Sequence, residues 1–390
     1  MTKRPPSSRI APEDDYTPAA MAARNRLASE VSGGDLSALL LPGDVAGYRG
    51  NVENLMGFAQ IPIGLAGPLR LHGAHARGEF LVPLATTEGT LVASYNRGMR
   101  AVTESGGAAV RVLRNEIHSA FTLLTRTPDE ARRIAEWITA HQDQIEAAVR
   151  GATRHGTFLR SECTVFGSRL VTHLIYDPAD AMGINMITSA SYDVARMISR
   201  AHGSLRFLFP SATQGDKKTT VHNFVHGRGR SVAAEVLVPA GVVGRMLKSS
   251  ATLIHEYHLN NLETGALAGG LGFNMHIANG ITALGLATGQ DVAYVGEGAN
   301  GYLVVERHGD DLLFALTIPS LYVGTVGGGT GLPTSRACLE LLGATGPGSA
   351  LKLAEIFAGT CLAGEISVLA AIASHQFVHA HDTLGRNRPS

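Results

Sequence analysis

Four short segments of this sequence combine ionisable side chains with glycine or other small neighbours. They are residues 85–89, 215–218, 288–291 and the histidine cluster at 375–381. A lysine ammonium can stabilise an oxyanion, and a carboxylic acid beside it can donate a proton if its pKa is raised. A histidine can protonate a leaving group near neutral pH. Together these side chains supply what the reduction of a carbonyl group requires.

Each segment also has an ordinary structural explanation when it is taken alone. Glu88 could stand at a helix start, Asp291 could cap the segment that follows it, and residues 216–218 could form a solvated loop. The segments can carry chemistry only if the fold brings them together.

Between residues 120 and 210 the pattern predicts a compact inserted domain. A capping box at Thr127–Glu130 predicts a helix over 128–150. Two β-rich runs, 158–166 and 169–176, predict a hairpin. With strands at 121–125 and 205–209 and a helix over 181–202, the order is β-α-β-β-α-β, the split-βαβ or ferredoxin-like arrangement.

The rest of the chain is expected to form a large mixed domain, which makes the fold class α+β. Thr17-Pro18 predicts the start of an Ala-rich helix, and residues 60–90 read as strands and turns. Further elements are expected at 239–262, 274–289 and 349–381 (helical) and at 302–317 (a hairpin). The predicted organisation is a flexible arm at 1–16, a large domain at 17–119 and 210–390, and an inserted domain at 120–209.

Composition excludes several classes of protein. With 33 basic and 33 acidic residues the net charge is zero, which argues against an electrostatic nucleic-acid binder. An apolar share of 45% is too high for a disordered chain. Three widely spaced cysteines, no secretory h-region and no uninterrupted apolar run near ~20 residues favour a cytoplasmic protein without a membrane span.

Two motifs suggest ligand sites but have simpler explanations. Residues 296–301 match G-x-G-x-x-G, yet a strand follows them instead of preceding them, so a glycine-rich turn is expected. His375, His379 and His381 have a spacing that could chelate zinc, but no H-E-x-x-H is present and no metal is expected. A zinc hydrolase is therefore the weakest of the functions considered.

From about residue 50 to 386 the chain resembles the catalytic portion of 3-hydroxy-3-methylglutaryl-CoA reductases, of the class shared by eukaryotes, archaea and some bacteria. The motifs that carry the resemblance occur in the same order: ENLMG at 53–57, IPIG at 61–64, AGPL at 66–69, ATTEG at 85–89, DAMGINM at 180–186, DKK at 216–218, GRG at 227–229, GQD at 289–291, GTVGGGT at 324–330, and His381 with LGR at 384–386. The resemblance implies a large dimerising domain with an inserted ferredoxin-like cofactor domain.

The resemblance also implies catalytic roles for four residues. Lys217 resembles the lysine that stabilises the thioester-derived oxyanion, and Glu88 resembles the proton donor at the aldehyde stage. Asp291 resembles the carboxylate that tunes this pair, and His381 the histidine that protonates the departing CoA thiolate. The implied reaction uses two hydrides and passes through a hemithioacetal and an aldehyde to an alcohol, mevalonate in the family.

Cofactor and substrate residues follow from the same comparison. NADPH (NADP+) is implied because Arg154 matches a position that meets the 2′-phosphate. The implied cofactor-binding residues are Arg154, Asp180, Met182, Gly183, Asn185, Gly327 and Gly328. The implied substrate-binding residues are Glu53, Asp216, Lys218, Asn279, Ser119 and Asn260. A homodimer or dimer of dimers is implied as well, with the active site between protomers.

Two of these positions depart from the family pattern. Ser119 stands where an arginine is usual, and Asn260 stands where a lysine pairs with the substrate's terminal carboxylate. Loss of one partner from such a pair typically costs ~2–5 kcal/mol in binding, although Lys218 and Arg100 could compensate in part. The open alternatives are a mevalonate-forming reductase, a paralogue acting on an acyl thioester without that carboxylate and, more remotely, a non-catalytic scaffold.

Overall fold

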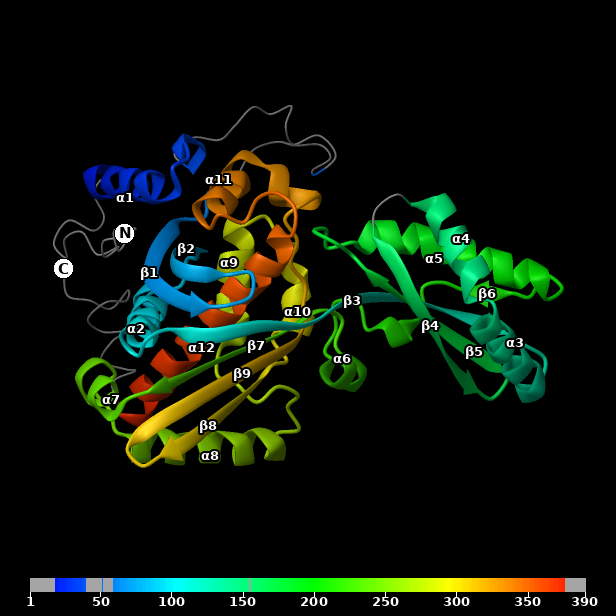
Figure 1. Ribbon diagram of the computed structural model, residues 1–390. Helices are drawn as coiled ribbons and strands as arrows, with labels where there is room; N and C mark the ends of the chain where they lie inside the picture. The colour runs from blue at the N-terminus through cyan, green and yellow to red at the C-terminus, as the bar shows by residue number, and fades with distance from the viewer. Residues whose placement is uncertain (1–17, 40–50, 52–58, 154–155, 376–390) are drawn as a thin grey trace.

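The computed structural model describes residues 18–39, 51, 59–153 and 156–375, which Figure 1 shows as a larger and a smaller lobe. One strand, β3 (Ala108–Leu124), runs from the larger lobe into the smaller one. Each lobe has its own cluster of buried apolar side chains. Helices and a mixed sheet occur together, which confirms the predicted α+β class.

The larger lobe is built on a sheet with the strand order β2-β1-β3-β7-β9-β8. Its remaining strands are β1 (Ile63–His72), β2 (Arg77–Ala85), β7 (Gly229–Val238), β8 (Tyr302–His308) and β9 (Asp311–Leu321). The pair β1 and β3 is parallel, and the other neighbouring pairs are antiparallel. The hairpin predicted over 302–317 is confirmed as β8 and β9.

The helices of this lobe pack on the sheet and on one another. They are α1 (Pro18–Ser32), α2 (Leu91–Glu104), α6 (Val221–His226), α7 (Ala240–Met246), α8 (Ala251–Leu267), α9 (Ile277–Ala287), α10 (Val295–Gly298), α11 (Pro333–Leu341) and α12 (Ser349–Ala373). The helix predicted over 239–262 is interrupted because Lys248 has φ +54° and Ser250 starts a new helix, accepting a hydrogen bond from Leu253 N.

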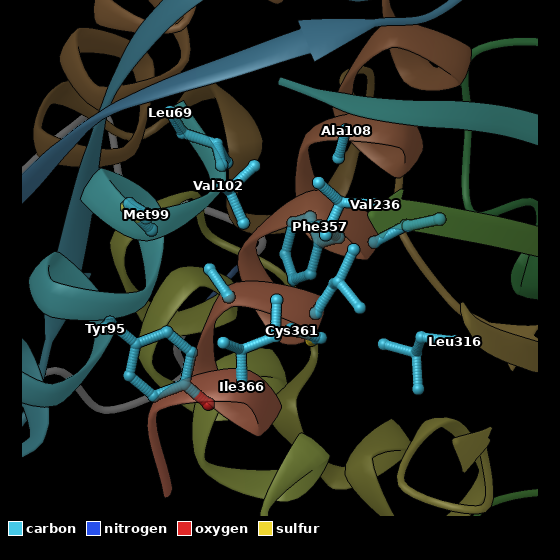
Figure 2. Close-up of a cluster of buried hydrophobic side chains, with 14 of the residues drawn as sticks. Leu69, Tyr95, Met99, Val102, Ala108, Val236, Leu316, Phe357, Cys361 and Ile366 are labelled. Atoms are coloured by element: carbon cyan, nitrogen blue, oxygen red, sulfur yellow. The ribbon is translucent and has the colours of Figure 1, made fainter. Parts of the chain in front are cut away.

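Helix α12 is the centre of the larger core. Figure 2 shows its residues Phe357, Cys361 and Ile366 among apolar side chains of α2 and the sheet. The helix is long and apolar enough to cross a membrane, but 94% of its apolar window is buried inside the protein. Its buried carboxylate Glu365 accepts hydrogen bonds from the backbone N–H groups of Met275 and His276, both at 2.7 Å. These bonds satisfy the carboxylate in an otherwise apolar interior.

The smaller lobe has the predicted order β-α-β-β-α-β. After β3 come α3 (Pro128–Ala140), α4 (Gln142–Ala152), β4 (Thr157–Phe166), β5 (Arg169–Asp177), α5 (Ile184–Ala201) and β6 (Phe207–Leu208). The strands lie in the order β4-β5-β3-β6, and every neighbouring pair is antiparallel. Thr127 caps α3 as predicted, but the expected single helix is divided at His141, whose φ of −118° is not helical.

Strand β3 changes partner between Glu116 and Ile117. Its residues 109–116 pair with β7, and its residues 117–124 pair with β5. The predicted strand at 121–125 is therefore only the last part of a 17-residue strand. The two lobes share this strand, and the change of partner falls three residues before the boundary predicted at 119/120.

Candidate active site

Two of the predicted catalytic residues form an ion pair. Lys217 lies in the loop between the 3-10 helix η3 (Ala212–Gln214) and α6, and Asp291 caps the 3-10 helix η4 (Val292–Tyr294). Lys217 Nζ lies 2.6 Å from Asp291 Oδ2, and the two side chains are 40% and 44% exposed. Asp291 Oδ1 accepts a second hydrogen bond, from Ala293 N at 3.1 Å. The ammonium is therefore held in place but remains accessible to a ligand.

The backbone of Lys217 has an unfavourable conformation. Its φ of +56° lies in the left-handed region, which non-glycine residues rarely adopt. The surroundings hold this conformation, because Lys217 N donates a 2.6 Å hydrogen bond to Glu297 Oε1. Lys217 Nζ also lies 5.0 Å from the centroid of the Tyr294 ring, within range of a cation–π contact.

A network of buried polar side chains holds the loop that carries Lys217. Arg228 Nη1 donates to Glu297 Oε1 at 2.8 Å and to Asp216 Oδ1 at 3.0 Å. The Glu297 side chain is 0% exposed and the Arg228 side chain 1%. Asn223 Nδ2 donates to Glu297 Oε2 at 3.1 Å, and the Tyr294 hydroxyl donates to Asp216 Oδ1 at 3.0 Å. Every carboxylate of the network therefore has a donor.

Burial sets the protonation equilibria of this network. It raises the pKa of Glu297 to about 7, against the opposing effects of Arg228 and the Lys217 N–H. Burial also lowers the pKa of Arg228. Tyr322 and the two carboxylates together raise it by more than burial lowers it, so the pKa of Arg228 lies above its ordinary value. Arg228 therefore remains a cation while Glu297 titrates near neutral pH.

Sequence reasoning assigned no role to Glu297 or Arg228. Glu297 lies inside the G-x-G-x-x-G match at 296–301. The expected glycine-rich turn is only partly correct, because residues 296–298 belong to the short helix α10 and only residues 299–301 connect it to β8. The only signal in the sequence is a carboxylate within a glycine-rich segment that no nucleotide motif explains. Gly296 lets this segment pack closely, because a Cβ there would make a tight contact of 3.0 Å with Lys217 O.

Two further predicted site residues, Glu88 and Asn279, lie together, although the sequence did not predict this pair. Glu88 follows β2, and its N–H donates to Thr86 Oγ1 at 2.9 Å. Asn279 lies in the first turn of α9, and its Nδ2 donates to both carboxylate oxygens of Glu88, at 3.1 and 3.3 Å. Within the described part of the chain, no hydrogen bond or ion pair links this pair to Lys217 and Asp291.

The segments predicted to bind the cofactor lie against each other. The backbone of Asp180 accepts hydrogen bonds from Thr325 N and Val326 N at 2.8 and 3.2 Å. Gly324 is required at this contact, because a Cβ there would lie 2.6 Å from Met182 N. The buried Arg230 donates to carbonyl oxygens of both segments, those of Ala179 and Val323. The two loops are thus fixed as one unit.

Several features of these loops suit an anionic ligand. Gly183 precedes α5, whose first backbone N–H groups receive no side-chain cap, and Asn185 lies exposed in its first turn. Gly327 and Gly328 have φ values of +81° and +58°, and a Cβ on either would meet open space. The carboxylate of Asp180 is engaged elsewhere, because it accepts hydrogen bonds from Gly348 N and Ala350 N at the start of α12.

The residues predicted to bind substrate are more scattered. Ser119 is buried in β3 with 2% exposure, whereas Asn260 lies exposed on α8. Lys218 Nζ donates to Asp216 O at 3.2 Å, next to the Lys217–Asp291 ion pair. Glu53, Arg154, His379 and His381 lie outside the described residues, and His375 is exposed at the end of the described chain.

Comparisons with known proteins agree with the resemblance. Residues 20–386 match the model of the family described as hydroxymethylglutaryl-coenzyme A reductase. The chain is 44% identical over 345 residues to the 3-hydroxy-3-methylglutaryl-coenzyme A reductase of Pyrococcus horikoshii, with 86% of this chain and 84% of that protein covered. It is 41% identical over 340 residues to the enzyme of the same name from Methanothermobacter thermautotrophicus, with 87% and 86% covered.

A solved structure has the same fold. The class II 3-hydroxy-3-methylglutaryl-CoA reductase from Streptococcus pneumoniae, bound to NADPH in open conformations, superposes with a TM-score of 0.70. Its sequence identity is 20%, and the match covers 93% of this chain and 95% of that one.

Proposed function

The chain belongs to the hydroxymethylglutaryl-coenzyme A reductase family, and on that premise we propose that it reduces 3-hydroxy-3-methylglutaryl-CoA to mevalonate and CoA with NADPH. It is an oxidoreductase by family and by its named relatives. The observation that carries the proposal is the Lys217–Asp291 ion pair at 2.6 Å, held on a buried network but open to solvent. Such an ammonium can stabilise an oxyanion without reorganising during the reaction.

Lys217 acts where negative charge develops. Hydride addition to the thioester carbonyl gives the oxyanion of a hemithioacetal, and the ammonium stabilises that oxygen. Collapse of the hemithioacetal releases the CoA thiolate, which His381 protonates. Asp291 holds the ammonium in place through the ion pair, since its own carboxylate is held by Ala293 N. Bound NADPH supplies the two hydrides.

Glu88 acts at the second reduction. Its carboxyl group donates a proton to the oxygen of the aldehyde as that carbon is reduced to the alcohol. The amide of Asn279 orients the carboxyl group through both of its oxygens. No described contact joins Glu88 to Lys217, so we infer that substrate binding or assembly of two protomers completes the site. A homo-oligomer and a cytoplasmic location are part of the proposal.

The joined loops at 180–185 and 324–328 support the cofactor assignment. The uncapped N-terminus of α5 favours phosphate, and the open glycines let the backbone approach a ligand closely. The carboxylate of Asp180 holds its loop against the start of α12, and Asp180 does not itself need to touch the cofactor. The reductase of the same fold from Streptococcus pneumoniae binds NADPH.

The experiment measures NADPH oxidation and thiol release with hydroxymethylglutaryl-CoA. We expect two NADPH oxidised for each CoA released. Lys217→Ala should abolish both signals, because the oxyanion loses its cation. Arg132→Ala is the matched control, since it removes an exposed cation that also pairs with a carboxylate, Glu136. Full activity of Lys217→Ala would overturn the role of this lysine.

A second function is favoured by Ser119 and Asn260, which are not cations. The paralogue would reduce an acyl thioester that lacks the terminal carboxylate. A panel of CoA thioesters with and without that carboxylate separates the two functions. Turnover of a neutral 3-hydroxyacyl thioester, with none of hydroxymethylglutaryl-CoA at millimolar concentration, would replace the first proposal by the second.

A further inference from the structure

A cluster of histidines lies where the two lobes meet, outside the residues assigned to reduction. His118 is on β3, His173 is on β5, and His222 and His226 are one turn apart on α6. The ring centroid of His118 lies 5.0 Å from that of His173 and 5.5 Å from that of His222. The rings of His173 and His222 are 5.2 Å apart. Three separate elements, β3, β5 and α6, therefore place their imidazole rings next to one another.

The positions of these side chains follow from strand and helix periodicity. In the antiparallel pair β3–β5, His118 is opposite Ile175 and His173 is opposite Ala120, so the two histidines are diagonal neighbours on one face. Helix α6 presents His222 toward the same point. The sequence gives no sign of this arrangement, because 54 residues lie between His118 and His173 and 48 lie between His173 and His222.

The spacing of the nitrogen atoms suits a shared cation. One ring nitrogen from each of His118, His173 and His222 lies within 4.8 Å of the others. Around a tetrahedral zinc with bonds of about 2.0–2.1 Å, ligand nitrogens are roughly 3.4 Å apart. Small side-chain rotations would therefore close the set, and rotations of this size need no change in the strands that carry His118 and His173.

The imidazoles are in the form that binds metals. Burial, together with Arg228, lowers the pKa of His118 well below its ordinary value. Burial also lowers the pKa of His173 to about 4, against the opposing effect of Glu162. Burial also lowers the pKa of His222. At neutral pH each ring therefore carries a free lone pair. His118 Nε2 lies 3.3 Å from the Gln214 carbonyl oxygen, and donation to that oxygen leaves Nδ1 as the acceptor.

The cluster opens into a hollow of about 240 Å³ at the lobe junction. The other charged residues of its lining are two arginines and two glutamates: Arg114, Arg160, Glu116 and Glu162. Arg160 pairs with both glutamates, at 2.8 and 2.9 Å, and Arg114 donates to the His226 carbonyl oxygen. Among the described residues, no hydrogen bond joins His118, His173 or His222 to a carboxylate, although Glu162 lies across the β4–β5 pair from His173. The hollow leaves room for a further ligand.

We propose that His118, His173 and His222 form a binding site for a divalent transition-metal cation of the zinc type, with a fourth position open to the hollow. Three neutral imidazoles and one open position are the ligand set of several zinc sites. The proposal departs from the sequence-based expectation of no metal and does not depend on the substrate or the reduction mechanism.

The test uses the full chain, stripped with a chelator and titrated with Zn²⁺ against a chromophoric chelator, and separately with Co²⁺. We expect one Zn²⁺ per chain, and a Co²⁺ spectrum in the visible with the intensity of a four-coordinate site. His222→Ala should weaken Zn²⁺ binding at least tenfold. Because His222 is exposed, the variant should fold normally, which circular dichroism checks. The distant, exposed His308→Ala is the control and should retain the affinity.

Two results would overturn the proposal. One is the absence of stoichiometric Zn²⁺ binding by the unmodified chain. The other is unchanged affinity in both His222→Ala and His173→Ala, which would place the bound ion elsewhere, for example on the histidines at 375–381. Loss of affinity in these two variants, with retention in His308→Ala, supports the site whatever the enzyme reduces.

Discussion

The buried carboxylate Glu297 should make the stability of this protein depend on pH in an unusual direction. Burial raises its pKa from an ordinary 4.5 to about 7. Between these pH values the folded state binds more protons than the unfolded state, so the free energy of unfolding falls as pH rises. Each pKa unit is worth about 1.4 kcal/mol, which makes the total for this group about 3 kcal/mol.

The variant Glu297→Gln isolates this contribution. Glutamine has nearly the same shape and keeps an oxygen acceptor for Lys217 N, but it does not titrate. We expect the free energy of unfolding of the natural protein, minus that of the variant, to fall by about 3 kcal/mol between pH 4.5 and 7 and then level off. Urea unfolding followed by circular dichroism at a series of pH values measures this difference.

The control is Glu256→Gln, a change of an exposed glutamate on α8. Its difference curve should be flat, because the carboxylate there is in water in both states. A difference curve for Glu297→Gln that rises with pH would refute the reasoning. It would mean that Arg228 and the two N–H donors outweigh burial and hold the carboxylate ionised well below pH 4.5.

Two further predictions concern the joined cofactor loops. Asp180→Ala removes the acceptor for two N–H groups at the start of α12 and should lower the free energy of unfolding by about 1 kcal/mol and raise KM for NADPH. Asp193→Ala, a change of an exposed residue of α5, should do neither. Thermal unfolding and initial rates check both variants. Gly324→Ala places a Cβ 2.6 Å from Met182 N and should raise KM for NADPH more than it lowers kcat, while Gly241→Ala, whose Cβ meets nothing, should leave both unchanged.

The sequence was sufficient to predict those elements whose signals are local. The capping box at Thr127, the hairpin joined at 167–168 and the hairpin of β8 and β9 depend on neighbouring residues, and the structure has all three. The ion pair of Lys217 and Asp291 was implied by the resemblance, and its two residues are 74 positions apart in sequence. Neither periodicity nor spacing alone would have joined these two residues.

What the sequence did not reveal depends on long-range contacts. Glu297 and Arg228 are charged residues without a local signal of burial. They can be buried because each has hydrogen-bond partners inside the protein: Glu297 accepts from Arg228, Lys217 N and Asn223, and Arg228 also donates to Asp216. The full length of β3 was missed since its first half, with alternating exposed residues such as Leu113, pairs with a strand more than a hundred residues later. The three histidines likewise meet only through the pairing of β3 with β5.

The way in which the smaller lobe is attached constrains how it can move. The chain leaves the larger lobe along β3 and returns through residues 209–211, where Ser211 N donates a 2.7 Å hydrogen bond to Ala120 O. The two crossings therefore lie side by side as a narrow double ribbon. The loop at 179–182 is a further connection between the lobes, because Thr325 N and Val326 N donate to Asp180 O and Arg230 donates to Ala179 O. Rotation of the smaller lobe about the two crossings would have to break these bonds. Any such motion should therefore begin at the 179–182 contact, and the loop that carries Lys217, which begins immediately after the crossings, lies close to the axis and should move least.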